Sequence, residues 1–378
     1  MPLPALADRA SRDASATLGL TLPGDTVLYL LLPLHASVFG VTLPEAGLLL
    51  AANRLVRIAG YGWVTRGYHR FGPRAACVAA TIGAAAATLG YALTTGLIPL
   101  LIARLLWGLS FAALNIATQA LVTAEAAGAG RRSGRSRAII STGPMLGLLG
   151  GAMLAEIIGP QMVFLALGII AVMALPVAAR LPGGPGQTLR IPGRRLTLPS
   201  PLDLWAFVQG LTLDGVFVVG LSVIAVAVSP EGATLAAGVS LALRYVAEIV
   251  LGPPGGLVAE RWGAKRALVA VSLASAFGYA AISADLVWAG VVAVVLLRGL
   301  AAPLPALVAA AANPGALRVP AIAGMATWRD LGAGIGPLIA GLVLPLAPFA
   351  LYAGAALLLA AMTVVFALLQ AAAWRRSV

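Results

Sequence analysis

Apolar stretches of about 20 residues recur along the whole chain, and short polar segments separate them. The hydrocarbon core of a bilayer is about 30 Å thick, and a helix of about 20 residues crosses it. Twelve stretches are long enough, and we predict a transmembrane helix near each of them: 19–40, 44–65, 75–94, 97–121, 138–158, 161–180, 203–226, 233–255, 267–284, 287–311, 319–344 and 347–371. The pattern therefore predicts an all-α membrane protein with twelve transmembrane helices.

Residues 181–202 break this pattern because they are rich in Pro, Gly and Arg, a composition typical of loops. They separate six predicted spans from six others. We therefore predict two six-helix bundles, over residues 1–180 and 203–378, joined by residues 181–202 as a cytoplasmic linker.

The two halves carry similar residues at equivalent places. Asp25 in the first span corresponds to Asp214 in the seventh, and Arg104 in the fourth corresponds to Arg298 in the tenth. Parallel half repeats within a chain of twelve spans are typical of transporters, so we expect the two bundles to be pseudo-symmetric.

Composition and charge agree with a membrane protein. Hydrophobic residues make up 60% of the chain and charged residues only 10%, whereas soluble domains carry about 25% charged residues.

Six arginines lie inside the predicted spans, and the other 19 of the 25 Lys and Arg residues, including Arg137, fall on one side of the predicted topology. Cytoplasmic loops carry such an excess, so we expect both termini in the cytoplasm. The net charge of +12 then sets orientation and does not indicate a nucleic-acid partner. Abundant Ala, Gly and Arg beside a single Lys favour a GC-rich bacterial genome, and we predict that the protein lies in the bacterial inner membrane.

Charged residues inside the spans are the main candidates for function. A charge at the centre of a bilayer costs about 2.5–3.5 kcal/mol, so such groups face a cavity, a partner charge or a substrate. There are ten: Asp25, Arg54, Arg57, Arg104, Asp214, Arg244, Glu248, Arg298, Arg329 and Asp330. None lies in the third, sixth, ninth or twelfth span.

The six arginines outnumber the four carboxylates, and the guanidinium fork suits carboxylate and phosphate groups. We therefore predict a cavity for an anionic or zwitterionic small molecule. The predicted substrate-binding residues are Arg54, Arg57, Arg104, Arg244, Arg298, Arg329, Asn115, Gln119, Tyr29 and Trp107, with Asn53 as a further donor. The alternative is that arginines and acids pair to hold the helices together. Arg244 and Glu248 are four residues apart and are expected to pair, whereas the adjacent Arg329 and Asp330 should have partners on other helices.

The carboxylates are candidates for carrying protons. Burial favours the protonated carboxyl and a nearby arginine favours the ionised one, so an acid that exchanges its arginine between two conformations would load and release a proton. We predict this role for Asp25, Asp214, Glu248 and Asp330, with Asp25 and Asp214 as first choices. Permanent structural pairing is the alternative for each.

Three motifs carry a family resemblance. The first is the loop after the second span and its repeat after the eighth, with His69, Arg70, Gly72 and Arg74 in one copy and Gly256, Glu260, Arg261, Gly263 and Lys265 in the other. The second is Arg104-Leu-Leu-Trp-Gly108 in the fourth span. The third is a glycine–proline motif in the fifth span, made of Gly143, Pro144, Gly147, Gly150 and Gly151. With these motifs the chain resembles the major facilitator superfamily over essentially its full length.

The resemblance implies roles for the motif residues. Residues His69, Arg70, Gly72, Gly256, Glu260, Arg261 and Gly263 would form the cytoplasmic gate, in which His69 stands where the family has an acid and could make that latch sensitive to pH. Arg104 would contribute to proton coupling. The fifth-span motif is associated with proton-driven exporters, and the family is usually monomeric.

These observations lead to a functional prediction. We expect a secondary active transporter that exports a small organic anion or zwitterion in exchange for protons by alternating access. Multidrug efflux of lipophilic compounds, symport of an organic anion, and a binding protein that no longer transports are the alternatives.

Other chemistry is poorly represented. Cys77 is the one cysteine, and His35 and His69 are far apart in the sequence, so we expect neither a disulfide nor a metal site. We find no nucleotide-binding loop and no nucleophile elbow, and therefore predict that the chain is not an enzyme and has no cofactor.

Overall fold

The structure is a computed structural model that describes residues 3–184, 199–228 and 233–375. Within these residues every element is helical, and ten helices are long and apolar enough to cross a membrane. The predicted linker 181–202 lies mostly outside the described residues.

Helices of the first half overlap the predicted spans but differ from them in bounds and continuity, since the first begins at Leu3 instead of residue 19 and the fifth at Ala129 instead of residue 138. The first span is broken at Leu22, because Pro23 has no backbone N–H to continue the helix, and α3 runs through the second and third spans but bends sharply at Gly72, where φ is 79°. This positive φ suits glycine, which has no Cβ. The elements are α1 (Leu3–Thr21), α2 (Pro23–Leu34), α3 (Leu43–Leu93), α4 (Leu97–Val122), α5 (Ala129–Ile158), α6 (Pro160–Met173) and α7 (Leu175–Ala179).

Helices of the second half repeat this arrangement. The seventh span is again irregular, because one segment of π-helix lies between two α-helices. The elements are α8 (Pro201–Gln209), η1 (Gly210–Val216, the π-helix), α9 (Phe217–Val228), α10 (Ala233–Trp262), α11 (Ala264–Ser283), α12 (Val287–Ala301), α13 (Leu304–Ala312), η2 (Gly315–Leu317), α14 (Arg318–Val343) and α15 (Pro348–Arg375).

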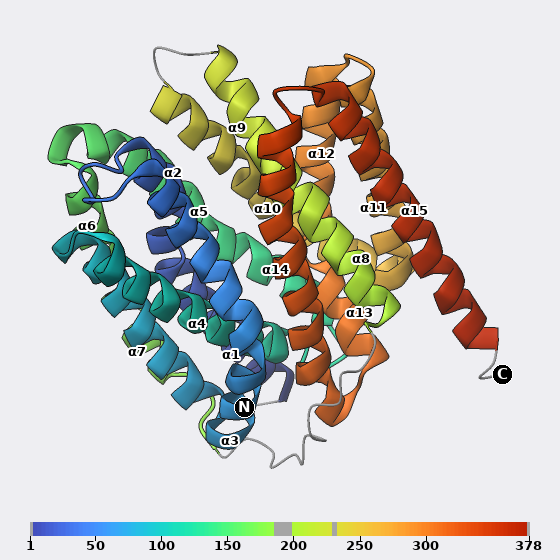
Figure 1. Cartoon of the computed structure of the whole chain (residues 1–378). Coiled ribbons are helices and arrows are strands. Elements are labelled where there is room, and N and C mark those ends of the chain that lie inside the picture. Colours follow the sequence, from blue (N-terminus) through green and yellow to red (C-terminus); the bar gives the residue numbers. More distant parts are fainter. Residues whose placement is uncertain (1–2, 185–198, 229–232, 376–378) are drawn as a thin grey trace.

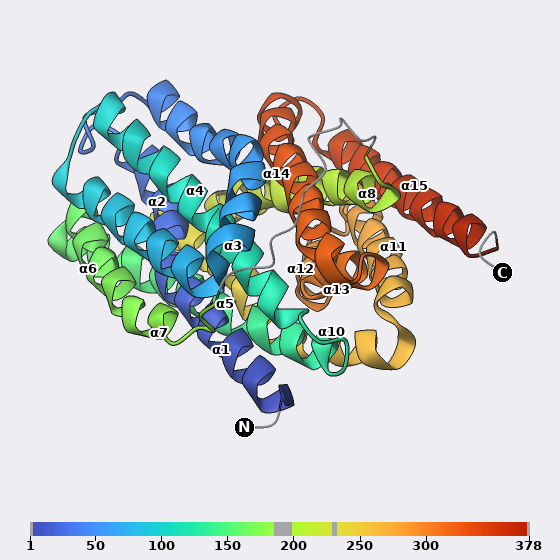
Figure 2. The same cartoon turned by 90° about the horizontal axis from the view of Figure 1, so that it is seen from below.

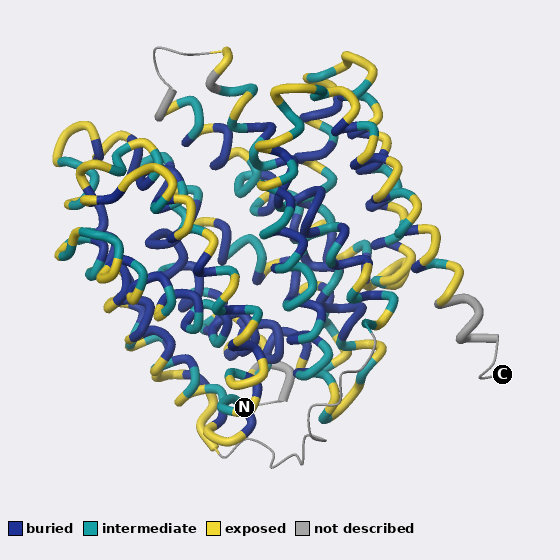
Figure 3. Tube along the Cα trace, in the orientation of Figure 1, coloured by how far each residue is buried: buried dark blue, intermediate teal, exposed yellow. Residues whose placement is uncertain are grey.

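The two halves form two groups of helices that stand side by side (Figure 1). Both chain ends lie toward the lower edge of Figure 1, and we call this the termini side. Seen from below, α5 and α10 meet at one edge of the contact between the groups, and α3 and α14 meet at the other (Figure 2). Buried residues fill the middle of both groups, while exposed ones follow the outer helices (Figure 3). Many of these exposed side chains are large and apolar, such as Ile157, Phe277 and Leu342, as expected for a surface that faces lipid.

Candidate functional site

A cavity of about 210 Å³ lies between the two halves. Its walls come from α1 to α5 in the first half and from η1, α9, α10, α12 and α14 in the second. Nine of the ten charged residues predicted inside the spans line it: Asp25, Arg54, Arg57, Asp214, Arg244, Glu248, Arg298, Arg329 and Asp330. We call it the central cavity.

Arg104 does not line the central cavity, although we predicted it as a substrate-binding residue. Its side chain is 0% exposed and forms an ion pair with Asp25 from behind. It also donates from Nε to the Leu49 carbonyl at 3.1 Å, and its guanidinium lies 5.2 Å from the centre of the Tyr29 ring. Asn53 donates to the same carboxylate oxygen as Arg104, from Nδ2 to Asp25 Oδ1 at 2.8 Å. Arg104 is therefore placed to hold Asp25 in position.

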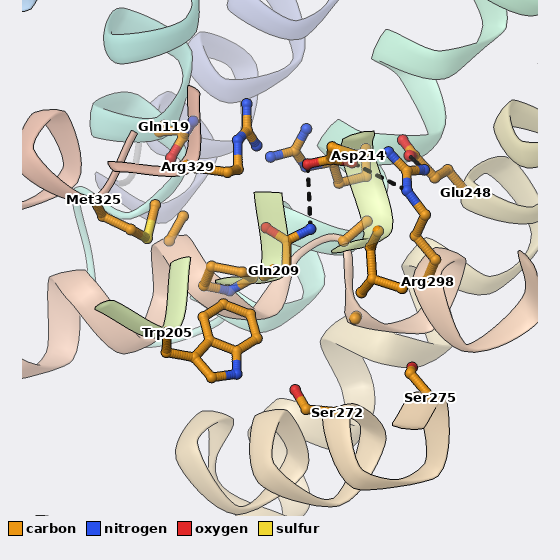
Figure 4. Close-up of a pocket in the computed structure, with 16 residues that line it drawn as sticks. Gln119, Trp205, Gln209, Asp214, Glu248, Ser272, Ser275, Arg298, Met325 and Arg329 are labelled. Carbon is orange, nitrogen blue, oxygen red and sulfur yellow. Dashed lines mark hydrogen bonds and ion pairs between the residues drawn. The ribbon is translucent and has the colours of Figure 1, made fainter. Parts of the chain in front are cut away.

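The second half contains the equivalent pair. Arg298 donates from Nη2 to Asp214 Oδ1 at 2.7 Å and from Nη1 to Glu248 Oε1 at 2.6 Å. Gln209 donates to the free oxygen of Asp214 at 3.2 Å. Figure 4 shows Arg298 reaching between the two carboxylates. One arginine therefore serves two acids here, whereas Arg104 serves only Asp25.

Both aspartates lie where a helix is irregular. Asp25 follows the break at Pro23 between α1 and α2, and Asp214 lies within the π-helical segment η1. Such π-segments occur frequently at functional sites. The sequence equivalence of the two aspartates is thus matched by an equivalent interruption of their helices.

Two further contacts join the halves across the central cavity. Asp330 on α14 accepts from the Tyr61 hydroxyl at 2.8 Å and lies 3.3 Å from Arg57 Nε. This confirms the prediction that Asp330 has partners on another helix, whereas the same prediction is wrong for Arg329, which has no carboxylate within 4.0 Å among the described residues. At the other edge, Ser141 on α5 donates to Glu248 Oε2 at 2.7 Å.

The predicted pair between Arg244 and Glu248 is wrong. Glu248 interacts with Arg298 and Ser141 instead. Arg244 lies over the ring of Tyr245, 4.8 Å from its centre, and donates to its hydroxyl at 3.1 Å. The spacing of four residues along α10 permitted the pair, but side chains of α5 and α12 reach the carboxylate first.

Four arginines of the central cavity have no carboxylate within 4.0 Å among the described residues. They are Arg54 on α3, Arg137 on α5, Arg244 on α10 and Arg329 on α14; the ion pairs of the described chain do not include them. Each half supplies two of them. We call this set the four unpaired arginines.

Arg137 was missed by the sequence analysis, which placed it in a loop because the fifth span was predicted to begin at residue 138. Helix α5 instead begins at Ala129, so Arg137 lies two turns into it and lines the central cavity. The Gly-, Ser- and Arg-rich start of α5 concealed the helix. One signal was available: Arg137 is four residues before Ser141 and therefore on the same helix face.

A smaller chamber of about 60 Å³ adjoins the central cavity on the side of the second half. The two share Arg137, Asp214, Glu248, Arg298 and Arg329 as lining residues. The other lining side chains are mostly neutral, and the polar or aromatic ones are Gln119, Trp205, Gln209, Ser272 and Ser275. Figure 4 shows the charged side chains on one side and Trp205, Ser272 and Ser275 on the other. We call this space the side chamber.

The predicted neutral residues have different positions. Gln119 donates from Nε2 to Asn115 Oδ1 at 2.8 Å, so the two act as a unit; Asn115 lines the central cavity and Gln119 the side chamber. Tyr29 lines the central cavity. Trp107 does not, because it is fully buried and stacks behind Phe111, which takes the place on the wall.

The gate motif after the eighth span joins the halves on the termini side. Glu260 accepts from the backbone N–H of Arg131 at 2.9 Å and lies 3.3 Å from Arg131 Nε. Helices α10 and α5 approach closely here, since a Cβ on Gly256 would lie 2.1 Å from the Gly130 carbonyl oxygen. Gly263 then ends the helix with φ 86°. Arg261 is exposed.

The first copy of the motif makes no such ion pair among the described residues. His69 is buried and packs edge-to-face on Tyr68, while Arg70 lies over Phe71. The contact between halves is made instead by Arg318, which donates to the carbonyls of Thr123 and Ala124 at 3.0 and 2.9 Å. The two gate contacts are therefore chemically different.

The fifth-span motif packs α5 against the first span. A Cβ on Gly143 would lie 1.8 Å from the Gly19 carbonyl oxygen, and Gly147 and Gly151 contact Pro23 and Val27. Pro144 lies within α5 and is buried. Gly150 differs from the other glycines because nothing lies within 4 Å of its Cβ position.

Within the described residues no group of three metal-ligating side chains occurs. Cys77 is a buried free thiol.

Comparisons with known proteins agree with this architecture. The family model described as Major Facilitator Superfamily matches residues 15–228. The human organic anion transporter MFSD10 (TETRAN) is similar in structure, with a TM-score of 0.77 at 16% identity, over 97% of this chain and 100% of that one. The proton:xylose symporter XylE bound to 6-bromo-6-deoxy-D-glucose has a TM-score of 0.76 at 14% identity, over 96% and 94%. No curated protein sequence matches the chain.

Proposed function

Because this chain belongs to the major facilitator superfamily, whose members are multi-pass membrane transporters and not enzymes, we propose that it carries a small organic anion through the central cavity. Transport proceeds by alternating access, with the two halves rocking about the charged site. Protons are the coupling ion, the direction is export from a bacterial cell, and the working unit is a monomer.

The four unpaired arginines carry the proposal for the substrate. The two other arginines that line the central cavity, Arg57 and Arg298, are each engaged by a carboxylate. The remaining four present guanidinium groups from both halves to one space. A bound anion would supply the missing negative charge and would bridge the halves, which is what a rocking carrier requires of its substrate. The fold is also that of a protein described as an organic anion transporter.

The two aspartate–arginine pairs support proton coupling. Each carboxylate is held by one arginine on a neighbouring helix, and the helix that carries the acid is interrupted beside it. A proton on Asp214 would release Arg298 toward Glu248, so that protonation changes the contacts between helices.

Support for export comes from α5. Gly143, Gly147 and Gly151 bring it close to α1 and to Pro23 and Val27 of α2, so the exporter-type motif packs against the helix that carries Asp25, the first of the proposed proton carriers.

Proton movement in proteoliposomes tests the proposal. Purified protein is offered organic anions, phosphorylated metabolites and lipophilic cations, and pH change inside the vesicles is recorded. We expect anions to move protons in wild-type protein, and Arg244→Gln or Arg329→Gln to weaken the apparent affinity about tenfold, the effect of about 1.4 kcal/mol.

The matched control is Arg66→Gln, which removes an exposed arginine of α3 that does not line the cavity and should leave transport unchanged. Proton flux with lipophilic cations alone, or full activity in both cavity variants, would contradict the anion proposal and favour multidrug efflux.

A further inference from the structure

The side chamber contains buried polar atoms that no protein group satisfies. Trp205 is 1% exposed and Gln119 is 7% exposed, yet neither the Trp205 indole N–H nor Gln119 Oε1 has a hydrogen-bond partner among the described residues. An unsatisfied buried polar atom costs about 1–3 kcal/mol, so these atoms indicate that a polar group comes to the chamber.

These unsatisfied atoms are uncharged and include both a hydrogen-bond donor and an acceptor. The Trp205 indole N–H is a donor, and Gln119 Oε1 is an acceptor. Ser272, also buried, adds a hydroxyl on the side of Trp205 (Figure 4). A hydroxyl or amide group both donates and accepts, and so matches such a set, whereas a carboxylate could use only the donors.

The chamber lies beside the arginines and is small. It shares Arg137 and Arg329 with the central cavity, and its volume of about 60 Å³ holds about four water-sized groups. We infer that the site has two parts, an inference that rests on the proposed function. The four unpaired arginines hold the acidic group of the substrate, and the side chamber holds its hydroxyl- or amide-bearing end. The substrate is therefore a polar-tailed organic acid and not a lipophilic one.

Matched pairs of anions test this inference. Each pair shares its charge and carbon skeleton and differs in hydroxyl groups: gluconate and hexanoate, tartrate and succinate, glycerol phosphate and propyl phosphate. Binding to the full chain in nanodiscs is measured by calorimetry. We expect the hydroxylated member of at least one pair to bind ten times more tightly or better, because a site built to hydrogen-bond a hydroxyl rejects the analogue that lacks it.

Two variants assign the effect to the chamber. Trp205→Phe removes the indole N–H and Gln119→Leu removes the amide, and both should reduce the ratio within the pair while the binding of the plain acid stays constant. Constant binding of the plain acid also shows that the variant is folded. Trp288→Phe is the matched control, because Trp288 is 59% exposed on α12 and lines neither space.

Every result of this binding experiment either supports or overturns the inference. Equal binding of the two members in wild-type protein, or a ratio unchanged in both variants, would show that the chamber holds only water, and the anion function would stand without it. Failure of every anion to bind would overturn the inference together with the function on which it rests.

Discussion

At the scale of single residues, the two aspartate–arginine pairs are equivalent in sequence but unequal in surroundings. Arg104 is completely buried and Asp25 is its one carboxylate partner among the described residues. Arg298 has two carboxylates, Asp214 and Glu248. Loss of one acid therefore leaves an uncompensated buried charge in the first half but not in the second.

We expect Asp25→Asn to be the more destabilising of the two equivalent substitutions. Breaking a buried pair costs about 3–5 kcal/mol because the remaining charge is unpaired, and Arg104 has no second acid. Asp214→Asn should cost clearly less, since Arg298 keeps Glu248. Thermal unfolding of the detergent-solubilised proteins measures the difference.

A double variant separates charge from packing. Asp25→Asn combined with Arg104→Gln should recover part of the stability lost in Asp25→Asn alone. Equal melting temperatures for Asp25→Asn and Asp214→Asn would contradict the unequal roles of the two pairs. Both single variants are expected to lose proton-driven flux.

At the scale of helices, small residues set how α5 lies on the first span. Gly143 and Gly150 belong to the same motif but have opposite surroundings, because one touches the Gly19 carbonyl and the other faces open space. The motif therefore contains a packing part and a part that packing does not explain.

The substitution Gly143→Ala should force α5 away from α1. Overpacking of this kind costs roughly 1–3 kcal/mol, and we expect a lower melting temperature and at least a tenfold loss of transport. Gly150→Ala is the control within the same motif and should retain both stability and transport. If Gly150→Ala were as damaging as Gly143→Ala, helix contact would not be the reason for the motif.

The same scale shows what could be predicted from sequence. The spans were predictable because a stretch of 20 apolar residues has few alternatives, and the family resemblance followed from the gate motifs. The partners of Glu248 could not be predicted, because they depend on how α5, α10 and α12 are rotated about their own axes. The same rotation puts Phe111 on the cavity wall and Trp107 behind it. Arg137 was missed because it precedes the apolar stretch of the fifth span, where the helix extends further toward the N-terminus through polar sequence.

At the scale of the whole molecule, the contacts on the termini side hold one conformation. The Glu260 contact ties α10 to α5, and the buried Ser133 donates from α5 to the Pro303 carbonyl of the other half at 3.1 Å. A carrier that alternates must break both contacts when this side opens.

We expect Glu260→Ala to increase the exposure of this side. The Arg131 side chain is 70% exposed, so the ion pair contributes about 0.2–1 kcal/mol, and its loss should increase opening about fivefold at most. The measurement is the labelling rate of Ser133→Cys by an impermeant maleimide in a Cys77→Ala background, which removes the native thiol.

The control for this experiment is Glu156→Ala, which removes an exposed acid at the opposite end of α5. Its labelling rate should equal that of the background protein. An unchanged rate in Glu260→Ala would show that the glycine contact between α5 and α10 holds the gate without the carboxylate.

The charge count of the cavity has an electrical consequence. Six arginines line the central cavity, Arg104 lies behind Asp25, and four carboxylates accompany them, so the empty carrier with ionised carboxylates holds an excess of three positive charges within the membrane. Each charge that crosses a potential of 100 mV exchanges about 2.3 kcal/mol with the field. Return of the empty carrier is therefore voltage-sensitive, whereas a carrier neutralised by a multivalent anion is not. In vesicles, one-for-one exchange of labelled anion should be faster than net movement and should respond less to an imposed voltage.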